Sequence, residues 1–178
     1  MRLFVAVSLP PEVLERVAAL ERPRADAVRW TTAAQWHVTL RFLGEVDDPA
    51  PVASALEAVP GRLRADGVRA VRARMGPAAA WFPGRHVLQL PVDGLDALAR
   101  AVAEATAPWG GPEAAPEYRG HLTLARARGR RPGPASLAGA ALEAAWDVDE
   151  CALMASTLGS EASRYETLAR VPLGLGPA

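Results

Sequence analysis

Two short segments of the chain each place a histidine two residues before a threonine. They are residues 37–42, which read HVTLRF, and residues 121–126, which read HLTLAR. The Val, Leu and Phe residues within them favour β-strands, and residues i and i+2 of a strand point to the same face. Each segment therefore predicts a strand that holds an imidazole beside a hydroxyl and turns apolar side chains into the core.

Two such strands facing each other would pair an acid with a base around one pocket. An unperturbed imidazole has a pKa near ~6.5, so it can hold or accept a proton at neutral pH. Phosphoester cleavage needs one group to take a proton from the nucleophile and another to protonate the leaving oxygen. Thr39 and Thr123 could donate hydrogen bonds to phosphate oxygens, and an arginine could bind them with two parallel hydrogen bonds. This scheme requires no metal and no other cofactor.

Core packing and metal binding are the alternative explanations for these histidines. A lone histidine in an apolar strand is more often a core residue with satisfied nitrogens, and threonine is common in strands. Two near-identical copies are hard to reach by core packing alone, so the repetition favours function. A zinc site of His37, His86 and His121 is conceivable, but the spacing does not favour it.

Composition limits the functional classes. The chain has 178 residues, 50% of them hydrophobic, and a formal net charge of zero, which excludes a molecule that is basic overall. Every basic residue is arginine, and the segment from Arg119 to Arg131 contains arginines but no acid. Within it, Arg128, Arg130 and Arg131 could attract RNA phosphates, or they could simply be a solvated loop.

The chain also carries few signals of secretion or membrane insertion. Its single cysteine, Cys151, cannot form a disulfide within one chain and is predicted to be buried and inert. No run approaches the ~20 apolar residues of a membrane span, and no signal peptide is evident. We therefore expect a cytoplasmic monomer with no membrane contact and no obligate protein partner.

Hydrophobic periodicity predicts an α+β protein. Strands are expected at residues 3–9, 36–43, 68–75, 86–92, 119–127, 146–158 and 165–173, and helices at 13–20, from 49 toward 63, from 95 to about 110, and at 135–144. Asp48 and Asp93 are predicted helix caps, and Pro60 interrupts the second helix. The order indicates one domain, residues 1–178, of two intertwined lobes that share a cleft and each supply one motif, at residues 37–40 and 121–124.

Aromatic residues offer further candidates. Trp81 and Phe82 lie in a predicted loop, where they could stack nucleobases or make hydrophobic contacts at the rim of the cleft. Arg164 and Tyr165 are interpreted as structural.

The two motifs resemble the His-x-Thr-x signatures of the two-histidine (2H) phosphoesterases. Residues 2–10, Trp36, Glu45 and residues 164–173 make the chain similar, more closely, to the bacterial and archaeal RNA 2′,3′-cyclic phosphodiesterases, also called 2′-5′ RNA ligases (LigT/ThpR-like). The resemblance spans nearly the whole chain. It implies a bilobal fold whose lobes are related by a pseudo-twofold axis, with mostly antiparallel sheets flanking a central cleft and helices outside.

The resemblance also implies an activity: hydrolysis of RNA 2′,3′-cyclic phosphate ends to 2′-phosphate. His37 is expected to protonate the leaving 3′ oxygen and His121 to take a proton from water. The same site could run as a 2′-5′ RNA ligase or act on nucleotide cyclic phosphates. A non-catalytic RNA- or nucleotide-binding module and a structural domain are the remaining alternatives.

By the same resemblance, Thr39, Thr123 and Arg126 bind the phosphate and Phe42 stacks on the terminal base. Strict alternation would turn Phe42 and Arg126 away from their histidines. Those roles therefore require a β-bulge or a strand end that changes their direction. Gly120 stands where relatives often have proline, which predicts a more flexible entry into the second motif.

Overall fold

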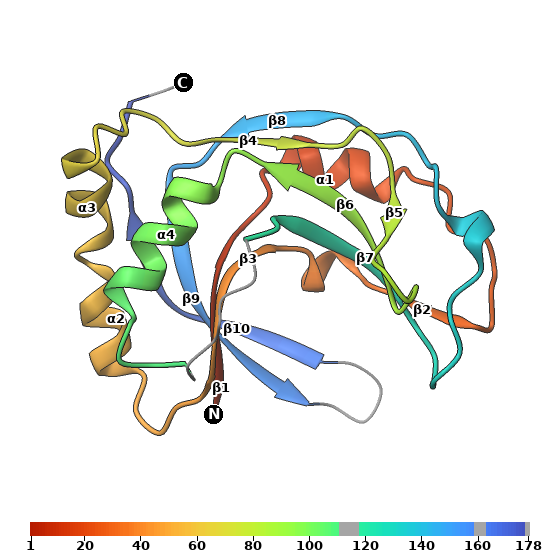
Figure 1. Cartoon of the computed structure of the whole chain (residues 1–178), viewed down its shortest axis with the longest axis horizontal. Helices are drawn as coiled ribbons and strands as arrows, with labels where there is room; N and C mark the ends of the chain where they lie inside the picture. Colours follow the sequence, from red (N-terminus) through yellow and green to blue (C-terminus); the bar gives the residue numbers. More distant parts are fainter. Residues whose placement is uncertain (111–117, 159–162, 177–178) are drawn as a thin grey trace.

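One antiparallel sheet runs through the molecule (Figure 1). The computed structural model describes residues 1–110, 118–158 and 163–176. Its strands are β1 (Arg2–Val7), β2 (Val28–Trp30), β3 (Val38–Glu45), β4 (Arg72–Met75), β5 (Ala80–Trp81), β6 (Val87–Asp93), β7 (His121–Ala127), β8 (Ala144–Asp147), β9 (Glu150–Leu158) and β10 (Ser163–Pro172). The helices are α1 (Pro11–Ala18), α2 (Ala50–Leu56), α3 (Val59–Ala65) and α4 (Asp96–Ala105), with 3-10 turns η1 (Ala33–Gln35) and η2 (Ala135–Leu137).

The two motif strands lie side by side in the middle of this sheet. The strand order is β10-β9-β1-β3-β7-β6-β4-β8, with β2 paired to β7 and β5 to β6. Each half contains a strand, a helix and a motif strand in chain order, β1-α1-β3 and β6-α4-β7. The halves join where Val38 of β3 pairs with Leu122 of β7. The predicted α+β fold with mostly antiparallel sheet is confirmed.

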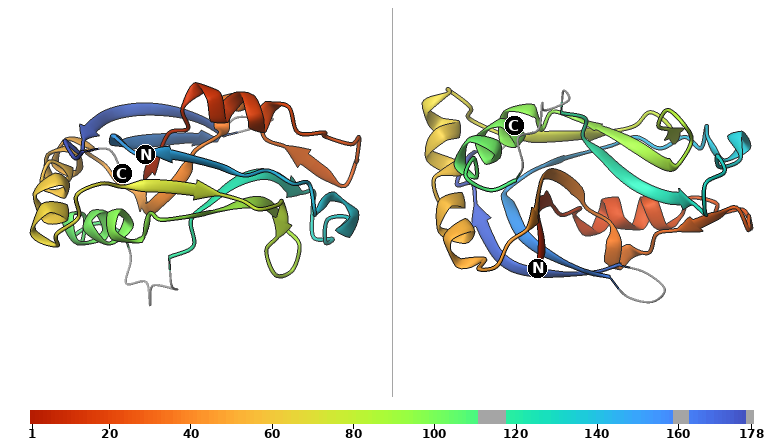
Figure 2. Two further views of the ribbon diagram at one scale, coloured as in Figure 1. Left: turned by 90° about the horizontal axis from the view of Figure 1, so that it is seen from above. Right: turned by 60° about the horizontal axis from the view of Figure 1, so that its bottom comes forward.

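Three of the helices lie at one end of the molecule, and several strand ends and a hairpin lie at the other. Helices α2, α3 and α4 gather at one end, and β2, the β5–β6 hairpin and the end of β7 lie at the other (Figures 1 and 2). Among the described residues, no helix combines the length and apolar character that crossing a bilayer demands.

Arg41 ties motif strand β3 to helix α4 of the other half. Its guanidinium donates hydrogen bonds to the Ala103 carbonyl, to Thr106 Oγ1 at 3.1 Å and to the Trp109 carbonyl at 2.9 Å. A cation is favourable at this position because the C-terminal end of a helix carries unpaired carbonyl groups and partial negative charge. The two halves are thus linked through side chains as well as through the sheet.

The helix predicted from residue 49 toward 63 is two helices. The apolar residues Val52, Leu56, Val59 and Leu63 are all buried, as their spacing indicates. The helix is interrupted after Leu56, the last residue of α2, and resumes at Val59, the first residue of α3. Pro60 lies in the first turn of α3. Proline is tolerated there because its missing N–H would have no partner in the helix.

Asp93 does not cap a helix, contrary to the prediction. It is the last residue of β6, and α4 begins at Asp96. Between them, Gly94 has a φ of +88° and comes so close to Arg72 that an added Cβ would lie 2.2 Å from its carbonyl oxygen. The turn therefore needs glycine, and this delays the helix. Asp48 does accept a hydrogen bond from the Ala50 amide at 3.0 Å.

Two other predicted elements differ in the structure. The helix expected at residues 135–144 is reduced to the turn η2, after which the Leu142 amide donates to Pro77 and the chain enters β8. The strand expected at 146–158 is divided into β8 and β9, and Val148 between them donates to Val71. The loop predicted at 112–116 lies outside the described residues.

Candidate active site

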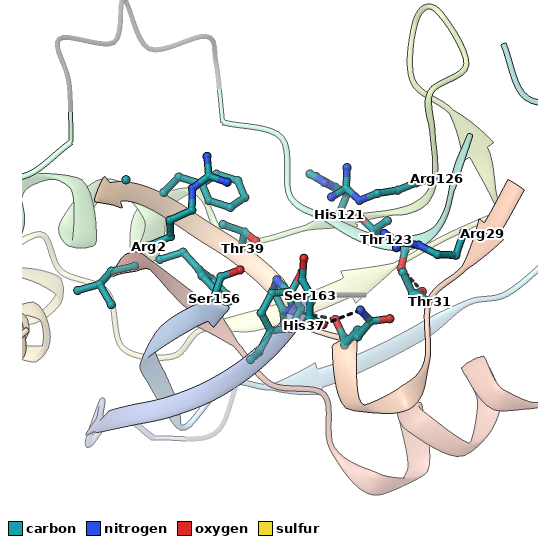
Figure 3. Close-up of a pocket in the computed structure, with 16 residues that line it drawn as sticks. Arg2, Arg29, Thr31, His37, Thr39, His121, Thr123, Arg126, Ser156 and Ser163 are labelled. Carbon is teal, nitrogen blue, oxygen red and sulfur yellow. Dashed lines mark hydrogen bonds between the residues drawn. The ribbon is translucent and has the colours of Figure 1, made fainter. Parts of the chain in front are cut away.

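The two His-x-Thr motifs line one cleft of about 290 Å³ (Figure 3). Val38 and Leu122, the pair that joins the two halves, are both buried in the core. Because neighbouring residues of a strand point to opposite faces, the residues flanking this pair turn into the cleft. His37, Thr39, His121 and Thr123 therefore meet at the centre of the sheet.

Each imidazole is held by its own backbone in the same way. His37 Nδ1 lies 2.9 Å from the carbonyl oxygen of Gln35, and His121 Nδ1 lies 2.9 Å from that of Arg119. A carbonyl oxygen can only accept, so both Nδ1 atoms carry the hydrogen. This leaves Nε2 of each ring as the nitrogen that can exchange a proton with a ligand.

Aromatic rings enclose both histidines. The His37 ring centroid lies 4.9 Å from that of Phe4 and 5.0 Å from that of Tyr165, the latter edge-on. The His121 centroid lies 4.8 Å from that of Phe82, also edge-on. These contacts fix the rings and remove water from them.

The pKa values of both histidines are lowered. Burial is the largest cause for His37, whose pKa falls from 6.5 to about 4 although the hydrogen bond to Gln35 opposes the change. Burial also lowers the pKa of His121, against the hydrogen bond to Arg119. The positive charge of Arg126 lowers the pKa of both rings further. Burial and the nearby guanidinium thus both favour the neutral form of each imidazole.

A pair of irregularities in β3 aims Phe42 into the cleft. Relative to β1, strand β3 contains two extra residues, Leu40 and Leu43, and both are buried. The alternation therefore shifts by one position after Leu40. Phe42, which is 63% exposed, lines the same cleft as His37.

One irregularity in β7 does the same for Arg126. Its pairing with β6 skips Leu124, and the consecutive residues Leu124 and Ala125 are both buried. Arg126 then emerges on the cleft side with Thr123 (Figure 3). The prediction that both side chains need a bulge is confirmed.

The sequence also matches a known protein family. A sequence model of the 2′-5′ RNA ligase superfamily matches residues 9–159. The chain belongs to this superfamily. A search among curated proteins gave no match.

Solved structures agree with this assignment to the two-histidine phosphoesterases. TT0787 of Thermus thermophilus shares 26% sequence identity over 98% of this chain and 99% of its own, with a TM-score of 0.77. LigT of Escherichia coli, complexed with 3′-AMP, shares 29% identity over 97% and 98%, with a TM-score of 0.69. Other structures of that LigT hold ATP, phosphate or NADP+. The likeness confirms the LigT-like fold.

Thr31 is a cleft residue that the sequence did not reveal. Its Oγ1 lies 2.8 Å from the Thr123 carbonyl oxygen and 2.9 Å from that of Leu124, to which it can donate. It also accepts a hydrogen bond from the indole Nε1 of Trp36 at 3.0 Å. Thr31 therefore connects the residue before His37 to the irregular part of β7. No short-range pattern marks such a contact.

Further polar residues of this superfamily member line the cleft without having been predicted. They include Arg2, Ser156 and Ser163 on the side of His37 and Thr39, and Arg29 on the side of Arg126 (Figure 3). Tyr165, interpreted from the sequence as structural, also lines the cleft and touches His37. These residues come from strands β1, β2, β9 and β10, and all but Arg29 are far from either motif in sequence.

Other candidates lie outside the cleft lining. Trp81 donates a hydrogen bond to the Pro134 carbonyl at 3.0 Å and packs against Gly133. His86 is exposed on the β5–β6 hairpin, and no three His, Cys, Asp or Glu side chains in the described residues are placed to hold a metal. Cys151 is buried, and burial raises the pKa of its thiol to about 12.

Gly120 allows β7 to start close to β6, and the expectation of a more flexible entry remains a prediction. The Val92 amide donates to the Gly120 carbonyl at 2.9 Å. A Cβ at residue 120 would lie 2.2 Å from the Val92 carbonyl oxygen. The strand thus starts at His121 in close contact with its neighbour.

Proposed function

We propose that this cleft hydrolyses RNA 2′,3′-cyclic phosphate ends to 2′-phosphates with its two histidines as acid and base. The observation that supports this most is the matched placement of His37 and His121. Each has Nδ1 held by a backbone carbonyl and Nε2 left for a ligand in one cleft. A single phosphorus centre between two such nitrogens can receive a nucleophile on one side and lose an alkoxide on the other.

In the proposed reaction, water attacks phosphorus and the bond from phosphorus to the 3′ oxygen breaks. His121 takes the proton from water, and His37 gives a proton to the 3′ oxygen. One water is consumed, and the phosphate remains on the 2′ oxygen. Each proton transfer is expected to contribute roughly 10²–10⁴-fold to the rate.

The lowered pKa values imply that His37 acquires its proton together with the substrate. In the empty cleft its pKa is about 4, so the ring is neutral at pH 7. A cyclic phosphodiester is an anion, and a nearby negative charge favours the charged form of imidazole. Substrate binding should therefore raise the pKa of the donor and draw one proton from solution.

The other cleft residues complete the proposal. Thr39 and Thr123 are placed to donate hydrogen bonds to non-bridging oxygens, and Arg126 can bind them through its guanidinium. Phe42 is a large, exposed apolar side chain at one end of the cleft. A base stacked on it would cover the part of the ring that is exposed. LigT, a relative, binds 3′-AMP and phosphate.

The test is an assay on a short RNA that ends in a 2′,3′-cyclic phosphate, with a chelator present and the position of the product phosphate determined. We expect 2′-phosphate from the wild-type protein. His37→Ala and His121→Ala should each reduce kcat/KM by at least about 10²-fold. Normal turnover by either variant would reject the acid–base pair.

The third histidine provides the matched control. His86 is exposed on the β5–β6 hairpin and does not line the cleft. His86→Ala should keep wild-type turnover, since it removes the same side chain without touching the cleft. Loss of activity in all three variants would indicate a general effect on folding.

Ligation is the second candidate, because the matching family is described as 2′-5′ RNA ligases. In ligation a 5′-hydroxyl replaces water as the nucleophile, and the same two histidines exchange protons. Adding a second RNA with a 5′-hydroxyl to the assay distinguishes the two reactions by the appearance of a longer product.

A further inference from the structure

The described chain gathers arginines at one end of the cleft. We call Arg29, Arg85, Arg126, Arg128, Arg130 and Arg131 the basic rim. All six are exposed, and they come from β2, the β5–β6 hairpin, β7 and the loop that follows β7. These segments lie at the end of the molecule opposite α2, α3 and α4 (Figures 1 and 2).

The basic rim is continuous with the cleft. Arg29 and Arg126 are direct partners across β2 and β7, so their side chains leave the sheet on the same face. Both line the cleft, on the side of His121 and Thr123 (Figure 3).

Backbone hydrogen bonds bring the rest of the rim to the same place. The Gly133 amide donates to the Arg85 carbonyl at 2.8 Å, which holds the loop after β7 against the hairpin tip. The Ala127 amide donates to His86 at 2.9 Å, and the Arg128 amide donates to Ala27 at 2.8 Å. Three separate segments thereby form one surface.

The charge of the segments that form this surface is mostly positive. Residues 24–31, 80–87 and 121–134 contain seven arginines and one acid, Asp26. The whole chain has 20 basic and 20 acidic residues, so this clustering is not a consequence of composition. Within the described residues, no hydrogen bond or ion pair involves the side chains of Arg130 and Arg131.

We infer that the basic rim binds the body of a single-stranded RNA whose reactive end lies between the histidines. This inference rests on the proposed function and adds the surface that holds the strand beyond its reactive end. Arg128, Arg130 and Arg131 do not line the cleft, so they lie outside the site of a mononucleotide bound there. The phosphates of a longer strand would be their ligands.

The experiment separates strand binding from chemistry. Arg130→Gln with Arg131→Gln removes two charges that lie outside the cleft lining. Its kcat/KM is compared with wild type on a nucleoside 2′,3′-cyclic monophosphate and on a 12-nucleotide RNA with the same end. We expect a change of less than twofold on the mononucleotide and a rise in KM of about tenfold on the RNA. The slope of log affinity against log salt should fall by about 0.7 for each phosphate that the variant no longer neutralises.

A second double variant controls for net charge. Arg69→Gln with Arg74→Gln makes the same charge change on residues that are exposed away from the cleft lining. It should leave KM for the RNA unchanged. An equal rise in KM for both double variants would overturn the inference, since net charge alone would then explain it.

A binding measurement keeps the inference apart from the proposed function. The probe is the same RNA ending in a 3′-phosphate, which cannot be turned over, measured by fluorescence anisotropy. Weaker binding by the Arg130/Arg131 variant supports the basic rim even if no cyclic phosphate is hydrolysed. Unchanged binding overturns it even if hydrolysis is normal. Equal competition by polyglutamate would assign the surface to acidic protein and also overturn it.

Discussion

At the scale of single residues, the surroundings of the two imidazoles determine how readily each ring is protonated. His37 is packed between Phe4 and Tyr165, and His121 lies against Phe82. Burial and the charge of Arg126 lower the pKa of both rings. The cleft thus disfavours a protonated histidine, and in the proposed reaction the anionic substrate brings the proton with it.

This coupling predicts the pH dependence of the Arg126→Gln variant. The free protein needs one protonated imidazole, so kcat/KM falls as pH rises above the pKa of the donor. Removing the Arg126 charge raises the pKa of both histidines. The alkaline limb of kcat/KM for a cyclic mononucleotide should therefore move to higher pH, while KM rises because no guanidinium binds the phosphate at this position.

The pH profile of kcat/KM for a cyclic mononucleotide is measured for the wild type, Arg126→Gln and Arg130→Gln. Arg130 is exposed and lies outside the cleft lining, so its variant should keep the wild-type limb. A limb that stays in place or moves to lower pH in Arg126→Gln would contradict the proposed electrostatic role.

Residue spacing also shows what could be predicted at this scale. His37 with Thr39, and His121 with Thr123, share a face because strand alternation is local, and the structure agrees. For Phe42 and Arg126 the spacing required a bulge without locating it. The bulges depend on pairing with β1 and β6, which lie elsewhere in the sequence.

At the scale of elements, Thr31 links the two motif strands. It follows β2, accepts the indole hydrogen of Trp36 and donates toward the carbonyls of Thr123 and Leu124. The Thr31 amide also donates to the Leu124 carbonyl at 2.9 Å. This contact holds the irregular part of β7 in register with the segment that precedes His37.

We predict that Thr31→Val impairs catalysis more than it impairs folding. Valine keeps the β-branched shape but leaves the Trp36 indole without an acceptor, which should cost about 1–3 kcal/mol of stability. A small displacement of His37 or Thr123 should lower kcat by roughly tenfold or more. KM for a cyclic mononucleotide should change little.

Thr31→Ser is the matched comparison, because it retains the hydroxyl and should restore both hydrogen bonds and kcat. The measurements are kcat, KM and the free energy of unfolding in urea for all three proteins. A Thr31→Val protein that loses stability but keeps its kcat would show that the contact is only structural.

At the scale of the whole molecule, the catalytic arrangement depends on the joining of two halves at one strand pair. The β3–β7 junction consists of the pair Val38 and Leu122 in the described residues. Arg41 adds hydrogen bonds from β3 to the end of α4. The cleft therefore needs both motif strands to be paired.

Acid should destabilise the fold through His37. Its pKa is about 4 in the folded protein and ordinarily 6.5, so the unfolded chain binds the proton more readily. The stability contributed by the neutral ring is complete above about pH 6.5 and is lost as pH falls toward 4. The total loss is roughly 3 kcal/mol for this one group.

The measurement is the free energy of unfolding of wild type and His37→Gln between pH 7 and pH 4. The carboxylates contribute to both proteins and cancel in the difference, so the wild-type curve should fall more steeply. Added inorganic phosphate should reduce the steepness by favouring the protonated ring. Parallel curves for the two proteins would contradict the buried, neutral state of His37.

The sequence by itself determined the two His-x-Thr strands, the faces they present and the α+β fold class, because strand and helix periodicity are properties of neighbouring residues. The interruption at Pro60 could be predicted from the sequence. The turn at Gly94 could not, since a glycine required by a close backbone approach looks like any other turn residue. Only the tertiary structure decided that β3 and β7 are neighbours, that bulges aim Phe42 and Arg126 into the cleft, and that Thr31 joins the motifs. These features arise from pairing between segments far apart in the chain, which no local pattern encodes.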